Sequence, residues 1–137
     1  MSLRFGSPEW ARGLMEQINA SSEYRQAASG WGVGFDGSLL LGFEPDGKAA
    51  EVRRLRLLLA AGACEAAEFV AGDAPAAFVL RAPFGLWRDV LERRTLAATA
   101  ILSGKMQVGG DKLTLLRYAA AHRALIACVA SMDTAWD

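Results

Sequence analysis

Residues 95–111 read TLAATAILSGKMQVGGD and carry three structural signals in succession. Thr95 is a suitable N-terminal cap, and the helix-compatible residues that follow it predict a short helix. Gly104 is expected to end that helix at a positive φ, because a residue without a Cβ adopts the left-handed conformation at little cost. Met106 and Val108 then alternate with polar neighbours, as in a strand. The stretch therefore predicts a helix that turns at Gly104 directly into a short strand.

Further helices are predicted on both sides of this stretch. Downstream, Asp111 is expected to cap one long C-terminal helix. The apolar face predicted for that helix comprises Leu115, Leu116, Ala119, Ala120, Ile126, Ala127 and Ala130. Upstream, a helix is expected to begin at Pro83. Near the N-terminus, Ser7-Pro8-Glu9 predicts a capped helix, and a second short helix is expected to end near Gly30.

The region between these helices has the period of a strand. Apolar residues alternate with glycine over 31–35, and Asp36-Gly37 is typical of a two-residue hairpin turn. We therefore expect a strand over 31–35, a tight turn and a return strand over 38–43. A further short strand is expected over 77–80.

Residues 49–71 fit two structures. Their alanine, leucine, arginine and glutamate content favours a helix. Leu55, Leu57 and Leu59, however, alternate with arginines, which favours a strand. Gly62 interrupts either pattern. The residues alone leave the choice open.

The composition excludes several classes of protein. The chain has 137 residues, with 15 Lys plus Arg and 15 Asp plus Glu, so its net charge is zero. A non-specific nucleic-acid binder needs a positive field that this chain lacks, and attraction to anionic lipid headgroups is weak for the same reason. The 53% apolar content excludes disorder. In one domain of this size, so much apolar surface must be buried in a core, an interface or a cavity.

The sequence also carries expectations about the compartment. The N-terminal residues lack the apolar core of a signal peptide, and no apolar run reaches the length that spans a bilayer. Cys64 and Cys128 lie in no metal-binding or redox motif, and two buried thiols are the simplest interpretation. We expect a soluble cytoplasmic protein without stable membrane insertion.

Motifs for catalysis are scarce. His122 is the single histidine, and its alanine-rich surroundings favour a surface or half-buried helix residue over a general base. The string Gly32-x-Gly34-x-x-Gly37 resembles a dinucleotide fingerprint, but strand-like residues follow where a helix is required. We therefore expect no catalytic residue, no metal and no cofactor.

Aromatic residues are prominent instead. The chain contains four tryptophans, and Trp10, Trp31 and Trp87 fall on predicted inward faces. Core packing explains them most simply. The alternative is a cavity for an apolar ligand, because such pockets are lined mainly by hydrophobic and aromatic side chains.

Three blocks of sequence together resemble one known family, the sterol carrier protein type 2 family, and in particular its small single-domain prokaryotic members. The first block is Ser7-Pro8-Glu9-Trp10 with Asn19, Tyr24, Ala27, Ala28 and Trp31; the second is Phe78-Val79-Leu80 with Pro83 and Trp87; the third is Ala97 to Leu102 with the stretch 103–111. The third block is the most specific. It has a helix, a small residue, Gly-Lys, an alternating apolar pair, and Gly followed by Asp.

The resemblance implies a fold and a function. The fold is α+β, with a curved, mostly antiparallel sheet of about five strands covered by helices on one face. An apolar cavity lies between the sheet and the C-terminal helices. Residues 50–59 and 63–71 are then strands, with Gly62 in the turn. Residues 1–137 form one lipid-binding domain that carries a fatty acid, acyl-coenzyme A, phospholipid or sterol-like lipid without catalysis.

Candidate wall residues follow from predicted inward faces beside the three blocks. They are Trp31, Phe78, Trp87, Leu91, Leu102, Met106 and Leu116. The competing hypothesis is a structural or interaction module whose apolar surplus forms a homodimer interface without a ligand. An enzyme is the third alternative.

Overall fold

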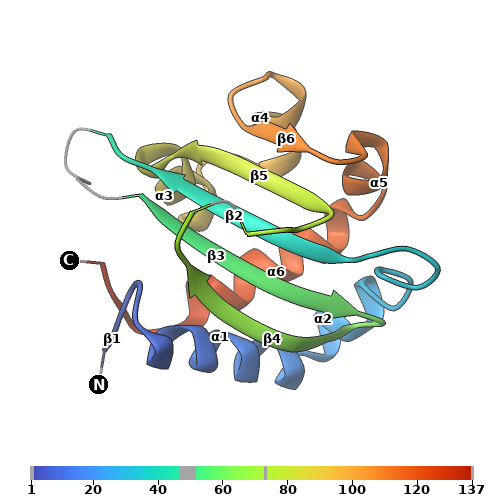
Figure 1. The fold of residues 1–137 in the computed structure, drawn as a ribbon, viewed down its shortest axis with the longest axis horizontal. Helices are drawn as coiled ribbons and strands as arrows, with labels where there is room; N and C mark the ends of the chain where they lie inside the picture. The colour runs from blue at the N-terminus through green and yellow to red at the C-terminus, as the bar shows by residue number, and fades with distance from the viewer. Residues whose placement is uncertain (1, 47–51, 73, 137) are drawn as a thin grey trace.

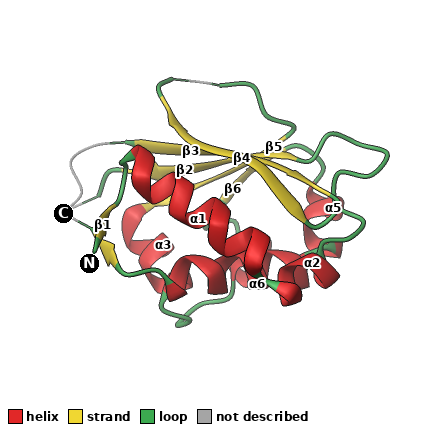
Figure 2. Cartoon of the chain, turned by 90° about the horizontal axis from the view of Figure 1, so that it is seen from below, coloured by secondary structure: helices red, strands yellow, loops and turns green. Residues whose placement is uncertain are grey.

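The computed structural model describes residues 2–46, 52–72 and 74–136. A five-stranded sheet forms one layer and helices form the other, on one face of the sheet (Figures 1 and 2). The helices are α1 Pro8–Ala20, α2 Ser22–Ala27, α3 Phe84–Leu91, α4 Ala97–Leu102, α5 Lys112–Arg117 and α6 Ala119–Ser131. The sheet contains β2 Ser38–Glu44, β3 Arg53–Ala60, β4 Ala63–Val70, β5 Phe78–Pro83 and β6 Gln107–Gly109. A separate parallel pair joins β1 Leu3–Arg4 to β7 Thr134–Ala135.

The strand order of the sheet is β4-β3-β2-β5-β6. β2 and β5 are parallel, and the other neighbouring strands are antiparallel. The register aligns one residue of each strand in a row that runs across the sheet: Phe69, Leu55, Leu41, Leu80 and Val108. All five belong to or pack against the hydrophobic core, so this row explains why the helices must cover this face. The predicted α+β fold with a mostly antiparallel sheet is confirmed.

The segment that the residues left open forms two strands. Leu55, Leu57 and Leu59 of β3 are at most 4% exposed, and the residues between them are half-buried on the opposite face. Pairing with β2 and β4 on both sides overrides the helix propensity of the sequence. Gly62 lies in the turn at φ +81°. The predicted strands are confirmed over 53–60 and 63–70, while residues 50 and 51 lie outside the described part.

The predicted strand over 31–35 is wrong. These residues form turns and bends, with Gly32 at φ +77° and Gly34 at φ +82°. The segment folds around its own indole, because the Trp31 Nε1 donates to the Gly37 carbonyl at 2.9 Å. Asp36-Gly37 is therefore not a hairpin turn. The predicted return strand is present as β2.

The stretch 95–111 differs from the prediction in one detail. Helix α4 begins after Leu96 and has no side-chain cap, so Thr95 does not cap it. Gly104 has φ +80° and follows the helix directly, as predicted. The extended piece after it is β6, which pairs with β5.

The C-terminal helix is divided. The Asp111 side chain caps α5, as predicted, but that helix ends at Arg117, and α6 starts at Ala119 after the single turn residue Tyr118. The predicted apolar face is only partly correct, because Ala120 and Ala130 are exposed. The buried side of α6 consists of Ala121, His122, Ala124, Leu125, Cys128 and Val129.

Three tryptophans anchor the core, as predicted from their inward positions. Trp10, Trp31 and Trp87 are at most 3% exposed, and each indole N–H has an acceptor. Satisfied N–H groups remove the cost of burying these large side chains. Both cysteines are buried free thiols, and burial raises the pKa of Cys64 to about 11. Among the described residues, no helix combines the length and apolar character that a membrane span requires.

Two glycines provide a matched test of the backbone. Gly62 and Gly104 both have positive φ, but a Cβ on Gly62 would lie 2.6 Å from the Arg25 carbonyl oxygen, whereas the space around Gly104 is open. We expect Gly104→Ala to lower the free energy of unfolding by about 1 kcal/mol, from backbone strain alone. Gly62→Ala is expected to lower it by about 2 kcal/mol or more, because a rigid backbone atom must also move. Urea denaturation measures both values, and equal losses would contradict the predicted role of the contact with Arg25.

Candidate ligand-binding site

A small apolar space lies between the sheet and the helices, in the region where the resemblance implies a cavity. Its walls come from the inner face of the sheet and from α1, α3, α4 and α6. The lining residues are Phe5, Trp10, Leu39, Leu41, Phe43, Leu55, Leu80, Trp87, Leu91, Ala97, His122, Leu125, Ile126 and Val129. The volume is about 30 Å³, little more than a water molecule needs. We call it the inner space; it is too small for an acyl chain in this conformation.

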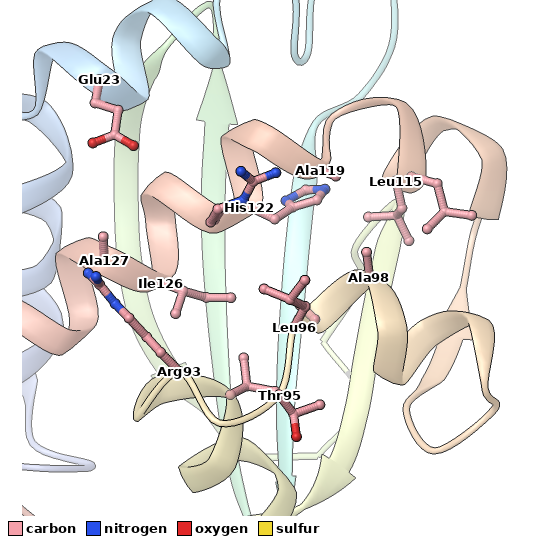
Figure 3. A pocket seen from close by; sticks show the side chains of 14 residues that line it. Glu23, Arg93, Thr95, Leu96, Ala98, Leu115, Ala119, His122, Ile126 and Ala127 are labelled. Carbon is pink, nitrogen blue, oxygen red and sulfur yellow. The ribbon is translucent and has the colours of Figure 1, made fainter.

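A larger pocket of about 280 Å³ lies on the other side of α6. We call it the outer pocket (Figure 3). Its wall is formed by α6, by the connection from α3 to α4 and by α5. The lining residues are Glu23, Val90, Arg93, Thr95, Leu96, Ala97, Ala98, Leu115, Leu116, Ala119, His122, Arg123, Ile126 and Ala127. Leu115 and Ala98 lie at one end, whereas Glu23 and Arg93 lie toward the other.

The outer pocket explains part of the C-terminal sequence pattern. Leu116, Ala119, Ile126 and Ala127 were predicted on the apolar face of the last helix, and all four line this pocket. Helix α6 therefore has two apolar sides. One side packs in the core, and the other is presented to the outer pocket.

The inner space and the outer pocket share three lining residues, Ala97, His122 and Ile126. The two spaces therefore adjoin at these side chains. The lining residues of the two spaces together extend from the outside of α6 to the sheet.

The structure distributes the predicted wall residues unevenly. Trp87 and Leu91 line the inner space, and Leu116 lines the outer pocket. Trp31, Phe78 and Met106 are buried in the core, and they are not among the lining residues of either space. Leu102 is 66% exposed at the end of α4, so its predicted inward position is wrong. Helix α4 has only six residues, so the position of Leu102 shortly before Gly104 was not enough to predict which side of the helix faces the core.

His122 is more deeply buried than its sequence context predicts. It was expected at the surface or half-buried, but it is only 9% exposed and lines both spaces. Its ring lies edge-on to Trp31, with 5.2 Å between ring centroids. The Nε2 atom is buried and has no hydrogen-bond partner among the described residues. Burial lowers the pKa of His122 to about 4, opposed by a backbone hydrogen bond with Leu115, so the imidazole is neutral at pH 7.

Charged groups lie at the edge of the outer pocket. Arg93 and Arg123 are exposed, and Glu23 lies across from them on α2. Arg93 has φ +63°, an uncommon conformation for a residue with a Cβ. Within the described ranges, no group of three His, Cys, Asp or Glu side chains is placed to hold a metal ion.

The buried imidazole makes stability depend on pH. In the unfolded chain His122 binds a proton near pH 6.5, whereas in the folded chain its pKa is about 4. The unfolded state therefore takes up the proton first as the pH falls, and the free energy of unfolding should decrease by about 2 kcal/mol between pH 7.5 and pH 5. Urea denaturation at each pH measures this. His122→Leu should abolish the decrease above pH 5, since the chain has no other histidine; an unchanged slope in that variant would contradict the assignment.

No family model matches the sequence, and no curated protein matches it. Among solved structures, sterol carrier protein 2 is 34% identical, with a TM-score of 0.82 over 93% of this chain and 98% of that one. A conserved hypothetical protein of Thermus thermophilus, considered a candidate sterol carrier protein, is 33% identical, with a TM-score of 0.83 over 96% of this chain and 91% of that one.

A third structure is similar in fold alone. The inverting sec-alkylsulfatase Pisa1 of Pseudomonas sp. is 18% identical, with a TM-score of 0.51; the match covers 79% of this chain but 15% of the sulfatase. The first two matches extend over nearly the whole of both chains at more than 30% identity. They agree with the resemblance drawn from the three sequence blocks. This chain is a member of the sterol carrier protein 2 family.

Proposed function

We propose that this protein binds a long apolar molecule at the outer pocket and the inner space, and carries it without changing it chemically. The observation that carries the proposal is the junction of the two spaces at Ala97, His122 and Ile126. The family supports it in general terms, since one similar solved structure is named sterol carrier protein 2 and another is named a candidate sterol carrier protein.

The apolar walls supply the driving force. A 12-carbon chain that leaves water gains roughly 10 kcal/mol at ~0.8 kcal/mol per CH₂ group. Much of this gain is offset by lost freedom of the ligand and by the work of widening the inner space. Helix α6 limits that work, because its second apolar side is already presented to the outer pocket. A micromolar Kd is consistent with this gain from apolar burial and the costs that offset it.

The pocket does not favour catalysis. Its ionisable lining residues are Glu23, Arg93, His122 and Arg123. None of them forms a nucleophile–base pair, and the imidazole has no polar side chain to orient it. A carrier role needs no such pair, so we assign the pocket to binding.

Exposed leucines favour the second candidate function, an interaction module. Leu96, Leu102 and Leu113 are 60–73% exposed. Such side chains stabilise a dimer when they form one patch. Analytical ultracentrifugation at several protein concentrations tests this candidate function. The interaction module would be favoured over the carrier if the protein is a dimer without bound lipid and the dimer dissociates after Leu102→Ser and Leu113→Ser.

The direct test of the carrier role is extraction. The purified protein is treated with organic solvent, and mass spectrometry compares the extract with that of an unrelated protein prepared in the same way. We expect stoichiometric long-chain molecules. The absence of any enriched species, together with no saturable binding of chains up to eighteen carbons, would refute the carrier role.

A substitution at the junction tests the location. Ala97→Phe is expected to raise the Kd for a fluorescent fatty acid at least tenfold, because the new ring fills the contact between the two spaces. Thr99→Phe places the same side chain at an exposed position of the same helix and should leave the Kd unchanged. Fluorescence titration measures both, after circular dichroism has confirmed folding. Equal affinities in the two variants would place the ligand elsewhere.

A further inference from the structure

His122 presents a buried nitrogen that the protein does not satisfy. The residue is 9% exposed, and its Nε2 atom has no hydrogen-bond partner among the described residues. An unsatisfied buried polar atom costs about 1–3 kcal/mol, so such atoms need a reason. The edge-on contact with Trp31 packs the ring but gives Nε2 no hydrogen bond.

The location of this nitrogen suggests what it binds. His122 lines both the outer pocket and the inner space. Its neighbours at the junction, Ala97 and Ile126, offer no polar side-chain atom. A ligand at the junction therefore meets one polar atom in an apolar wall. That arrangement fixes the position of one polar group of an otherwise apolar molecule.

The chemistry of the imidazole limits the group. Burial keeps the ring neutral at pH 7, so it attracts no anion by charge. A carboxylate here would lose its hydration without a cation to replace it, which is costly. A hydroxyl both donates and accepts, so it satisfies Nε2 in either tautomer of the ring. Arg93 and Arg123 do not supply a cation for a carboxylate at the junction, because both are exposed.

We infer that His122 is a specificity-determining residue that hydrogen-bonds the hydroxyl group of an uncharged, long-chain ligand at the junction of the inner space and the outer pocket. This inference rests on the proposed carrier function. It selects a ligand class within that function: long-chain alcohols and other hydroxyl-bearing apolar molecules, in preference to fatty acid anions.

Three probes of equal chain length test the inference at pH 7.5: 1-dodecanol, 1-chlorododecane and dodecanoate. Each displaces a fluorescent apolar probe from the protein. We expect 1-dodecanol to bind about tenfold more tightly than 1-chlorododecane, as one hydrogen bond to a buried group provides. Dodecanoate should bind more weakly than 1-dodecanol.

Two variants separate recognition from packing. His122→Leu fills a similar volume without a polar atom and should bind 1-dodecanol and 1-chlorododecane equally. His122→Gln retains an amide and should keep part of the preference. Circular dichroism and urea denaturation establish that each variant folds; if the leucine variant does not fold, the glutamine variant and the wild-type selectivity decide.

The outcomes are distinct. If the preference for 1-dodecanol survives in His122→Leu, if wild-type protein shows no preference, or if dodecanoate binds most tightly, the inference is overturned while the carrier function stands. A water molecule that satisfies Nε2 in place of a ligand would give the second of these results. If none of the three probes binds saturably, the carrier function and the inference fail together.

Discussion

The indole of Trp31 connects segments that are distant in the sequence, and the site depends on it. Its ring packs against Phe78 of β5, with 4.7 Å between centroids, and against Tyr118 at the break between α5 and α6. The backbone carbonyl of Trp31 accepts a hydrogen bond from the Ala61 N–H at the turn between β3 and β4, at 2.7 Å. The imidazole of His122 lies edge-on to the same ring. One buried residue thus contacts the turn between β3 and β4, the start of α6 and the histidine at the junction.

Helix α6, which follows the break at Tyr118, has two apolar sides. His122 and Leu125 are buried on one side, and Ala127 lines the outer pocket on the other. The apolar content of the sequence, 53%, is high for so small a domain. Part of that content lines the outer pocket instead of the core. A helix that is apolar on two sides therefore explains part of the high apolar content.

Sequence patterns predicted the single helices, caps and turns better than the way in which these elements pack against one another. The cap at Ser7, the stop at Gly104 and the inward tryptophans depend on local chemistry, and all are present. The strands β3 and β4 contradict local helix propensity, so only the family resemblance predicted them. The loop over 31–35 was missed because glycine at positive φ is not distinguishable by type from glycine in a strand. His122 was missed because its alanine neighbours give little indication of the buried side, although it lies two helical turns after the buried Leu115.

The pairing of β1 with β7 has a mechanical consequence. The two strands run parallel, so the chain enters at the start of one strand and leaves at the end of the other. Tension between the two ends would load the hydrogen bonds from Leu3 N–H to the Asp133 carbonyl and from Phe5 N–H to the Ala135 carbonyl together, in shear, instead of opening them one after the other. The Trp10 indole, which donates to the Thr134 hydroxyl at 3.0 Å, ties the same strand to α1 and the core. A pulling force on this protein would therefore meet its resistance at the termini first, before it reached the sheet or the pocket.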